Sequence, residues 1–298
     1  MIKKKMIVDI LDTISITHEF DKDKLIFLNT SDVLEGKILI NNYMPINQLK
    51  GQAKKTIQNG DILFSEIRPK NKRYAYVDVD KPEDYIVSTK LMVLRNKTSD
   101  VLTKYIYYFL TYDGMLDYLQ MRAENRICSF PQITFDILKP ILVNIPSIIQ
   151  QQKIIDVISN IDNKIELNNR INSELENLAK TIYDYWFVQF DFPDENGKPY
   201  KSCGGKMVYN QELKREIPAG WEVGTLSKLG DIAGGSTPST KNPLNFCHNG
   251  TAWITPKDLS LNVGNKFISR GELDVTDAGI KEASLKIYPK GTILLSSR

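Results

Sequence analysis

The sequence predicts an α+β (mixed α/β) fold in which two small domains are joined by a long coiled-coil-type helix. Residues 146–190 keep a heptad pattern without an internal glycine or proline, residues 1–145 alternate short β-like runs with turns, and later segments repeat earlier ones. The expected layout is a first domain over 1–145, a spacer helix over 146–190, a connector over 191–220 and an incomplete second domain over 221–298.

The spacer helix is predicted from its start signal and its period. Pro146 precedes Ser147, and Gln150 completes a capping box with that serine. An apolar period of 3.5 residues over this length favours a two-helix coiled coil, and the helix would be roughly 60 Å long. A long core helix of one large domain is the alternative. The predicted seam positions are Ile154, Ile158, Ile161, Ile165, Asn168, Asn172, Leu175, Ala179, Ile182 and Trp186.

The seam of this helix needs a partner. Asparagines at such positions lower stability and fix the register and the choice of partner. No second comparable stretch occurs in the chain. The partner helix is therefore expected either from another molecule, a different subunit or a second copy in a homodimer, or from a part of the protein that this sequence does not include.

Composition indicates a folded, water-soluble protein. The chain has 298 residues, of which 42% are hydrophobic and 25% charged, and it holds no apolar run of membrane-spanning length. Its N-terminus does not resemble a signal peptide. Three widely spaced cysteines, Cys128, Cys203 and Cys247, fit a reducing compartment, so we expect the cytoplasm.

The positive charge is concentrated in one part of the chain. Residues 1–146 hold 21 Lys and Arg against 18 Asp and Glu, although the whole chain has a net charge of only +3. Seven basic residues fall within residues 50–73. Such a local patch suggests a polyanionic partner, most often nucleic acid, while an ordinary solvated loop is an equally open interpretation.

Short elements are predicted throughout the first domain. Strands are expected at residues 24–29, 37–40, 60–65, 74–79 and 85–94, which are rich in β-branched and aromatic residues. Residues 101–119 then change to a helical pattern. The connector over 191–220 is rich in Gly, Pro and Asn and marks a domain boundary.

The second domain repeats two segments of the first at low identity. FLNTSDV at residues 27–33 corresponds to WITPKDL at residues 253–259, and NGDILFS at residues 59–65 corresponds to KGTILLS at residues 290–296. Both pairs occur in the same order at similar spacing, so the architecture is a repeat. The second copy ends at Arg298, inside a predicted strand.

This layout resembles the specificity (S) subunit of type I restriction–modification systems. The connector motifs carry the resemblance most specifically: WFVQFDFP at 186–193, GKPYKS at 197–202, MVYN at 207–210 and EIPAGW at 216–221. Residues 145–146 (IP) with 151–154 (QQKI) resemble the start of the family's helix. GGSTP at 234–238 and WITPKDL at 253–259 resemble the start of a target-recognition domain.

The resemblance implies a non-catalytic subunit with two target-recognition domains, each reading half of a split DNA site. Conserved helices would set the spacing and dock two methyltransferase subunits, and the complex would recruit the ATP-driven restriction subunit. This chain is then expected to bind no cofactor, because S-adenosylmethionine, ATP and Mg²⁺ belong to the partner subunits. The chain departs from the family by lacking the rest of the second recognition domain and the second conserved helix.

Candidate DNA-binding residues are chosen by chemistry and position. Lys and Arg neutralise phosphates, while Arg, Gln and Asn reach base edges. Each could equally be a solvated side chain, so the prediction concerns the cluster. The candidates in the first domain are Lys54, Lys55, Arg68, Lys70, Lys72, Arg73, Arg122, Arg126 and Gln132. Those in the second are Ser236, Thr237, Ser239, Lys241 and Lys257.

No convincing catalytic constellation is present. Pro193-Asp194 with Glu212 and Lys214 matches the loose spacing of a metal-dependent nuclease, but a turn is expected there and not the paired buried strands that hold Mg²⁺. Cys247-His248 lacks a second ligand pair. The remaining alternative is a half specificity protein that acts as a dimerisation or docking module without recognising a site.

Overall fold

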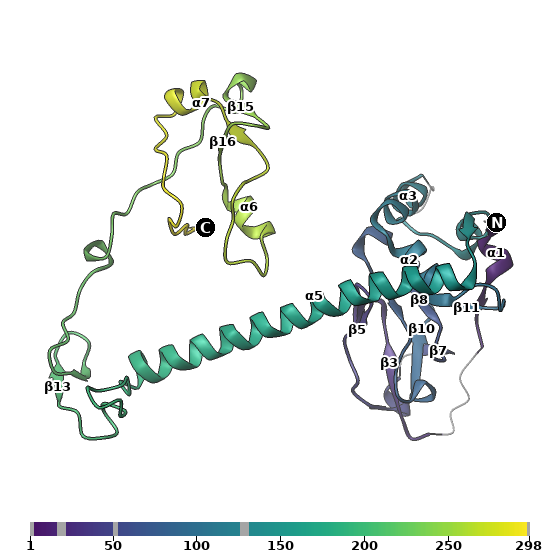
Figure 1. Cartoon of the computed structure of the whole chain (residues 1–298), viewed down its shortest axis with the longest axis horizontal. Helices are drawn as coiled ribbons and strands as arrows, with labels where there is room; N and C mark the ends of the chain where they lie inside the picture. Colours follow the sequence, from purple (N-terminus) through teal and green to yellow (C-terminus); the bar gives the residue numbers. More distant parts are fainter. Residues whose placement is uncertain (1–2, 17–21, 50–52, 126–130, 297–298) are drawn as a thin grey trace. The chain divides into compact units, whose positions relative to one another are not determined.

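The computed structural model describes residues 3–16, 22–49, 53–125 and 131–296. The chain forms two compact units, Met1–Ile182 and Tyr183–Arg298 (Figure 1). The first holds an α+β domain and nearly all of the long helix α5 (Ile148–Tyr183), and the second holds the connector and further short helices and strands. The predicted mixed fold with a long helix is confirmed.

One sheet of the first unit is antiparallel, with the strand order β2-β11-β8-β9. In it, Leu94 lies opposite Ile62 and Phe64 lies opposite Tyr74. All four residues of the central strand β8 are buried, because it has a neighbour on each side. The strands are β2 (Leu11–Ile14), β11 (Leu91–Asn96), β8 (Ile62–Ser65) and β9 (Tyr74–Tyr76).

A second sheet has the order β6-β3-β10-β7, in which only the β3–β10 pair is parallel. Its strands are β6 (Met44–Pro45), β3 (Lys24–Leu28), β10 (Tyr85–Ser88) and β7 (Ala53–Thr56). Two antiparallel pairs complete the unit, β1 (Lys3–Met6) with β12 (Leu142–Ile145) and β4 (Val33–Leu34) with β5 (Lys37–Ile38). Short 3-10 helices cover Thr30–Asp32, Ile46–Gln48, Pro69–Asn71 and Pro82–Asp84.

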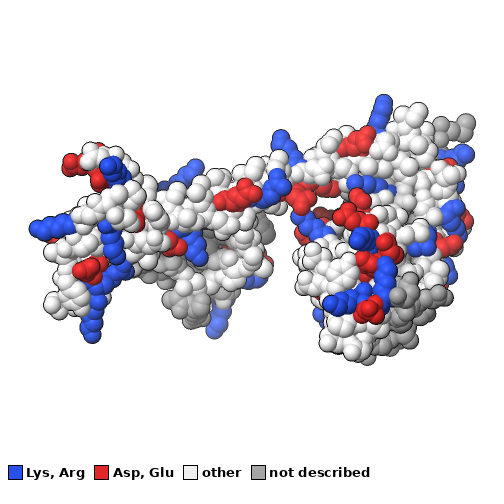
Figure 2. All heavy atoms as spheres, turned by 90° about the horizontal axis from the view of Figure 1, so that it is seen from below, with Lys and Arg blue, Asp and Glu red and all other residues white. Residues whose placement is uncertain are grey.

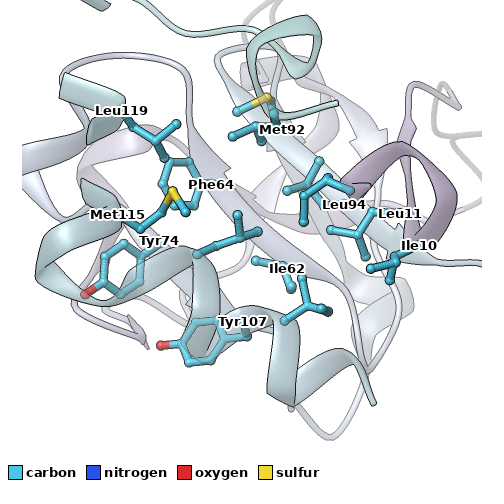
Figure 3. Packing of buried hydrophobic residues seen from close by; sticks show 14 of the residues in the cluster. Ile10, Leu11, Ile62, Phe64, Tyr74, Met92, Leu94, Tyr107, Met115 and Leu119 are labelled. Carbon is cyan, nitrogen blue, oxygen red and sulfur yellow. The ribbon is translucent and has the colours of Figure 1, made fainter. Parts of the chain in front are cut away.

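The largest core cluster lies between the antiparallel sheet and the helices. Figure 3 shows Met115 and Leu119 of α3 beside Phe64 and Tyr74 of the sheet, and all four side chains are buried. This packing fixes α3 against the end of β8, shortly before residues 68–73. The short helices of the domain are α1 (Ile7–Ile10), α2 (Thr103–Thr111), α3 (Asp113–Glu124) and α4 (Phe135–Leu138).

The single helix expected over residues 101–119 is two helices. Tyr112 is extended (φ −69°, ψ 149°), so the chain turns there before α3 starts at Asp113. A Cβ on Gly114 would lie 2.6 Å from the ring of Tyr112, so a larger residue there would displace this exposed side chain. Because the helix breaks at Tyr112, the face that α3 packs on the sheet need not continue the buried face of α2.

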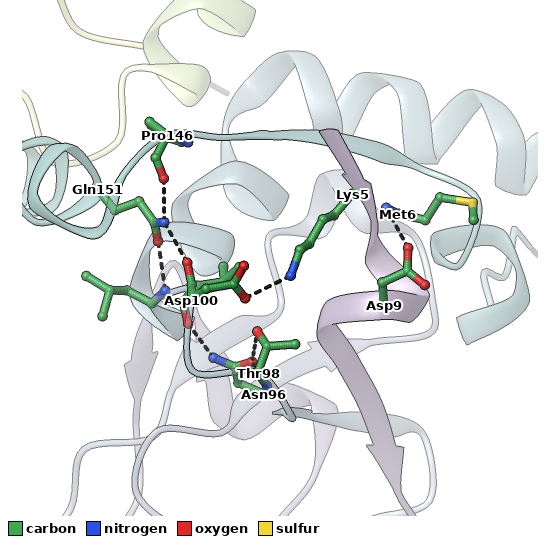
Figure 4. Close-up of polar contacts among 10 residues, drawn as sticks. Lys5, Met6, Asp9, Asn96, Thr98, Asp100, Pro146 and Gln151 are labelled. Atoms are coloured by element: carbon green, nitrogen blue, oxygen red, sulfur yellow. Dashed lines mark hydrogen bonds and ion pairs between the residues drawn. The ribbon is translucent and has the colours of Figure 1, made fainter. Parts of the chain in front are cut away.

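Helix α5 is fixed to the domain at its first turns. Gln151 is fully buried, and its Oε1 accepts a hydrogen bond from the Leu102 N–H at 2.8 Å (Figure 4). Its Nε2 donates to the carbonyls of Asp100 (3.0 Å) and Pro146 (2.9 Å). One side chain thus satisfies backbone groups of both the domain and the helix start.

Two further contacts tie α5 to the domain along its length. The Tyr108 hydroxyl donates to Asp162 at 2.9 Å, and Lys37 pairs with Glu166 at 2.9 Å. From residue 161 to the end of α5 every residue is exposed. The helix therefore has a docked first half and a second half that no described residue of its unit covers.

The second unit begins where the α-helix stops. A π-helix over Asp184–Val188 follows α5, so the predicted helix over 146–190 changes its geometry before its end. The aromatic side chains there pack on Trp221, which stacks on Phe192 with ring centroids 5.5 Å apart and contacts Phe187. The hairpin of β13 (Met207–Asn210) and β14 (Arg215–Pro218) completes the connector.

The rest of the second unit holds few regular elements. Its three-stranded sheet has the order β15-β17-β16, formed by Phe246–Cys247, Asp274–Val275 and Thr251–Ala252. Its helices are α6 (Pro256–Leu261) and α7 (Asp277–Glu282), with 3-10 turns at Leu226–Lys228 and Pro243–Asn245. The strand expected at residues 290–296 is not formed, and Ile293 and Leu295 are exposed, because no described segment pairs with it as β11 pairs with β8.

The first predicted repeat pair has the same local geometry in both copies. The Asn29 N–H donates to the carboxylate of Asp32 at 2.7 Å, and the Thr255 N–H donates to that of Asp258 at 2.8 Å. Each aspartate is the third residue of a short helix and closes a capping box. The two segments therefore start a helix in the same way despite their low identity.

Candidate nucleic-acid interface

The basic loop, defined here as residues 68–73, connects β8 to β9. Arg68 (φ 45°) and Lys72 (φ 54°) adopt left-handed backbone conformations on either side of the 3-10 turn Pro69–Asn71, and Pro69 is buried. These reversals fold four cations into a compact turn at the edge of the sheet. The tight turn explains why the loop protrudes and does not continue a strand.

Two lysines of the basic loop point at acidic residues of α3. Lys70 Nζ lies 2.9 Å from Asp117, and Lys72 Nζ lies 3.3 Å from Asp113 and 3.7 Å from Glu35. The ion pair with Asp117 raises the pKa of Lys70 above its usual value. The basic loop is therefore partly neutralised from within the domain.

Arg73 is held by the backbone of the domain. Its guanidinium donates to the carbonyl oxygens of Ser31 (3.0 Å) and Val33 (3.2 Å). These bonds tie the basic loop to the repeat segment at residues 27–33. Arg73 thus has a structural role whatever else it contacts.

Arg68 and Arg122 are the exposed guanidinium groups beside the loop. Neither side chain makes an ion pair or hydrogen bond with the residues that the structure describes. The Arg68 N–H donates to the Pro131 carbonyl at 3.1 Å, and Ile133 N–H donates to that of Glu66 at 2.8 Å. The segment from residue 131 onward therefore lies alongside the start of the basic loop.

Next to this segment is a hollow of about 370 Å³, and four of its five lining residues are polar. The hydroxyl of Thr134 is buried there without a hydrogen-bond partner among the described atoms. Gln132 donates from Nε2 to Glu66 at 2.9 Å, so its amide is already engaged. The lining residues are Arg122, Asn125, Thr134, Asp136 and Ile137.

Of the three remaining basic candidates in the first domain, the structure places the side chain of Lys55, which lies on a strand and not in the basic loop. Lys55 is half-buried on β7, and its Nζ donates to the carbonyls of Leu91 (2.7 Å) and Thr89 (3.1 Å). Burial lowers the pKa of this lysine, and the bonds make it a link between strands. The side chain of Lys54 and the whole of Arg126 lie outside the described residues.

The second-unit candidates lie on irregular segments. Ser236, Thr237, Ser239 and Lys241 are exposed. Lys257 on α6 is paired with Glu272, and this ion pair raises the pKa of the lysine.

The predicted seam of α5 is exposed, and the apolar surface extends beyond it. Ile161 and Ile165 are each 54% exposed. After Asn168 the apolar side chains shift to Ile171 and Leu178, in place of the predicted Asn172 and Ala179. A step of three residues in a heptad pattern overwinds a coiled coil locally. Trp186 lies on the π-helix and not on α5.

Acidic residues of α3 were missed by the sequence reasoning. Asp113, Asp117 and Glu124 share one face of the helix, and their spacing of four and seven residues is a signal that could have revealed it. On the face drawn in Figure 2, acidic and basic side chains are interspersed over the α+β domain. The ion pairs of Asp113 and Asp117 offset part of the positive charge that the sequence concentrates in the basic loop.

The nuclease alternative finds no support in the geometry. The carboxylate of Asp194 accepts the N–H groups of Asn196 and Lys198, each at 2.8 Å, and so closes a turn. Within the described ranges no group of three or more His, Cys, Asp and Glu residues is placed to hold a metal ion. No helix there has both the length and the apolar character needed to cross a membrane.

Comparison with known proteins places this fold and surface in a family. The profile of the "Type I restriction modification DNA specificity domain" matches residues 3–177. The HindI specificity subunit of Haemophilus influenzae is 34% identical over 341 aligned residues, which cover 99% of this chain and 73% of that protein. The MjaIX specificity subunit of Methanocaldococcus jannaschii is 51% identical over 83 residues, covering 28% of this chain and 19% of that protein.

A solved structure shares the fold. It is described as "Structural basis underlying complex assembly and conformational transition of the type I R-M system", with a TM-score of 0.50 and 17% identity. The match covers 84% of this chain and 59% of that one, so the present chain spans somewhat more than half of its length. The protein is of the DNA-recognition class, and it belongs to the family of type I restriction–modification specificity subunits.

Proposed function

We propose that this chain selects the DNA site of a type I restriction–modification complex, with its first unit reading one half of a split site. The second unit would take part in reading the other half. The observation that carries the proposal is the pair of exposed guanidinium groups, Arg68 and Arg122, beside the polar hollow of a family specificity domain. Arg is the side chain that most often reads guanine in the major groove.

The basic loop would supply affinity for DNA, and the hollow would supply the choice of sequence. Cations near the turn neutralise phosphates and set the position of the domain, which gives affinity without sequence choice. Arg122 and Asn125 offer donors and acceptors of the kind that read base edges. Lys55 and Arg73 would instead hold the fold.

Helix α5 would set the distance between the recognition units and dock methyltransferase subunits. Its 36 residues extend roughly 54 Å at 1.5 Å per residue. Its exposed apolar stripe is of the kind that marks protein–protein contacts. In the absence of a subunit partner, a second copy of the chain would cover the same stripe.

The chemistry of the complex would then reside in its partners. S-adenosylmethionine would be bound by methyltransferase subunits, and ATP and Mg²⁺ would be used by a restriction subunit recruited through the complex, while this chain binds none of them. A cytoplasmic location follows from a DNA substrate. The alternative of a docking module without site recognition is not favoured by the family match, which covers the domain and most of α5.

The proposal is tested by selecting duplexes from a randomised pool with the full chain bound to its methyltransferase subunit. We expect enrichment of a motif, and loss of that enrichment with Arg68→Glu or Arg122→Glu, each weakening binding by roughly 10- to 100-fold. Lys81→Glu is the matched control, because this exposed lysine follows the opposite end of β9. A wild-type complex without an enriched motif, or arginine variants that select like wild type, would contradict the proposal.

A further inference from the structure

Helix α3 carries an acidic stripe, defined here as Asp113, Asp117 and Glu124 with Gln120 between the last two. The spacing of four, three and four residues places these side chains on one face of the helix. The opposite side is buried in the core through Met115, Leu116, Leu119 and Ala123. The acidic stripe is therefore turned away from the packing surface.

The acidic stripe lies along the basic loop. Asp117 pairs with Lys70 at 2.9 Å, and Asp113 pairs with Lys72 at 3.3 Å. Gln120 accepts the backbone N–H of Lys70 at 3.3 Å and donates to Glu124 at 2.7 Å. The field of Glu124 also helps to raise the pKa of Lys70.

Packing does not require these carboxylates. The side chains of Asp113 and Asp117 are 84% and 63% exposed, so they bury little surface. Ion pairs this exposed contribute little to folding stability. Their regular placement opposite two loop lysines resembles instead a row of anions that occupies a phosphate-binding surface.

We propose that the acidic stripe competes with DNA phosphates for Lys70 and Lys72, and so lowers the affinity of this chain for non-specific DNA. The inference rests on the proposed function, because it takes the basic loop to face DNA. A lysine that stays paired within the domain neutralises no phosphate, so it releases no DNA counterion when the chain binds. Only a duplex that also satisfies the base-reading groups would then bind tightly.

The competition would act on the lysines and leave the arginines free. Arg73 bonds carbonyl oxygens, and Arg68 has no partner among the described residues. Specific binding, which uses Arg68 and Arg122, therefore would depend less on the acidic stripe than non-specific binding does. The device would raise the ratio of specific to non-specific affinity.

The test is the salt dependence of binding to a duplex of random sequence, measured with the full chain. Asp113→Asn, Asp117→Asn and Glu35→Gln together keep the side-chain size and remove the carboxylates paired with Lys70 and Lys72. We expect the slope of log K against log salt to steepen by about 1.8 in this triple variant, so that it loses about tenfold more affinity than wild type between 50 and 200 mM salt. The slope should steepen by about half as much in Asp113→Asn with Asp117→Asn, where Lys72 keeps Glu35. Adding Lys70→Gln and Lys72→Gln to the same variant should remove the extra slope.

The matched control removes two carboxylates elsewhere in the domain. Asp12→Asn with Asp78→Asn makes the same change in net charge as Asp113→Asn with Asp117→Asn, and Asp12 pairs with Lys97 far from the basic loop in sequence. We expect a much smaller change in slope. The single Asp117→Asn variant, with an expected increase in slope of about 0.9, serves if the double variant melts early.

An unchanged slope in the Asp113 and Asp117 variants, or an equal change in the control, would overturn the inference. If Arg68→Glu still abolishes site selection in that case, the proposed function stands and only the competition is wrong. If Arg68→Glu and Arg122→Glu also leave DNA binding unchanged, the proposed DNA-binding surface is wrong. The two failures are therefore distinguishable.

Discussion

The Oε1 atom of Gln151 accepts the backbone N–H of Leu102 at 2.8 Å, and this bond joins the start of α5 to the α+β domain. Leu102 precedes α2, so one buried amide connects the two helices (Figure 4). The direction in which α5 leaves the domain is fixed by this bond together with the buried Ile155. A spacer can set a distance only if its attachment is rigid.

Gln151→Ala should destabilise the first unit by about 2–4 kcal/mol, because it removes a fully buried side chain and leaves one partly buried N–H and two partly buried carbonyls without their partner. Urea unfolding followed by circular dichroism measures the change. Gln152→Ala is the control, since this exposed neighbour bonds only Asp156 and its loss should cost less than about 0.5 kcal/mol. Equal losses of stability in the two variants would show that Gln151 does not hold α5 on the domain.

Lys55→Gln should lower stability without weakening DNA binding. The lysine donates to two carbonyls between strands and is only half-buried, so we expect a loss of about 1 kcal/mol after discounting for solvent. Thermal melting and duplex binding on the same samples separate the two effects. A loss of DNA affinity of tenfold or more with unchanged melting would assign Lys55 to the interface.

Ile165→Lys should weaken the binding of the partner that covers α5, whether that partner is a methyltransferase subunit or a second copy of the chain. A charge placed on the exposed apolar stripe is costly to bury against a partner, and Ile165 lies at its centre. Light scattering of the chain alone, and co-purification with the methyltransferase subunit, would measure the loss. Asn177→Lys is the control, because it adds the same charge at an exposed residue that is not three or four residues from any of the exposed apolar side chains in the second half of α5. A wild-type chain that remains monomeric at micromolar concentration would contradict the homodimer alternative.

Alkaline pH should destabilise the first unit through Tyr74. Burial, followed by the fields of Glu35 and Asp113, raises the pKa of this phenol from 10.0 to about 12. The folded state therefore resists ionisation that the unfolded state accepts, so the contribution is complete below pH 10 and is lost as the pH rises towards 12. Tyr74→Phe should lose less stability than wild type between pH 9 and 11, and Tyr112→Phe, at an exposed position, should behave like wild type. Identical pH profiles for all three would exclude Tyr74 as the cause.

The sequence predicted the long helix and most strands because each depends on a local pattern. The heptad isoleucines before Asn168 mark α5, and the apolar run after Gly60 marks β8. The end of the helix could not be predicted in this way. Trp221, more than 30 residues further on, contacts Phe187 of the π-helix, and such a contact leaves no trace in the local period.

The candidate surface could be predicted only in part, because local sequence reveals a charge cluster but not its distant partners. The cations of the basic loop are visible as a charge cluster, but their partners Asp113 and Asp117 come from a helix some 45 residues later. From sequence, Lys55 was predicted to be a DNA-binding cation, whereas in the structure its ammonium group donates to two backbone carbonyls. The composition of a surface is thus readable from sequence, while its pairing requires the fold.

The most direct test of the central claim is to co-express the chain with its methyltransferase subunit and map methylation across the host genome. If the chain chooses the DNA site, a new methylated motif should appear, split and asymmetric when both units read, or palindromic when two copies present the first unit twice. Arg68→Glu and Arg122→Glu should erase or alter that motif, and Lys81→Glu should not. Stable co-purification without any new methylated motif would contradict the account and leave a docking subunit that recognises no site.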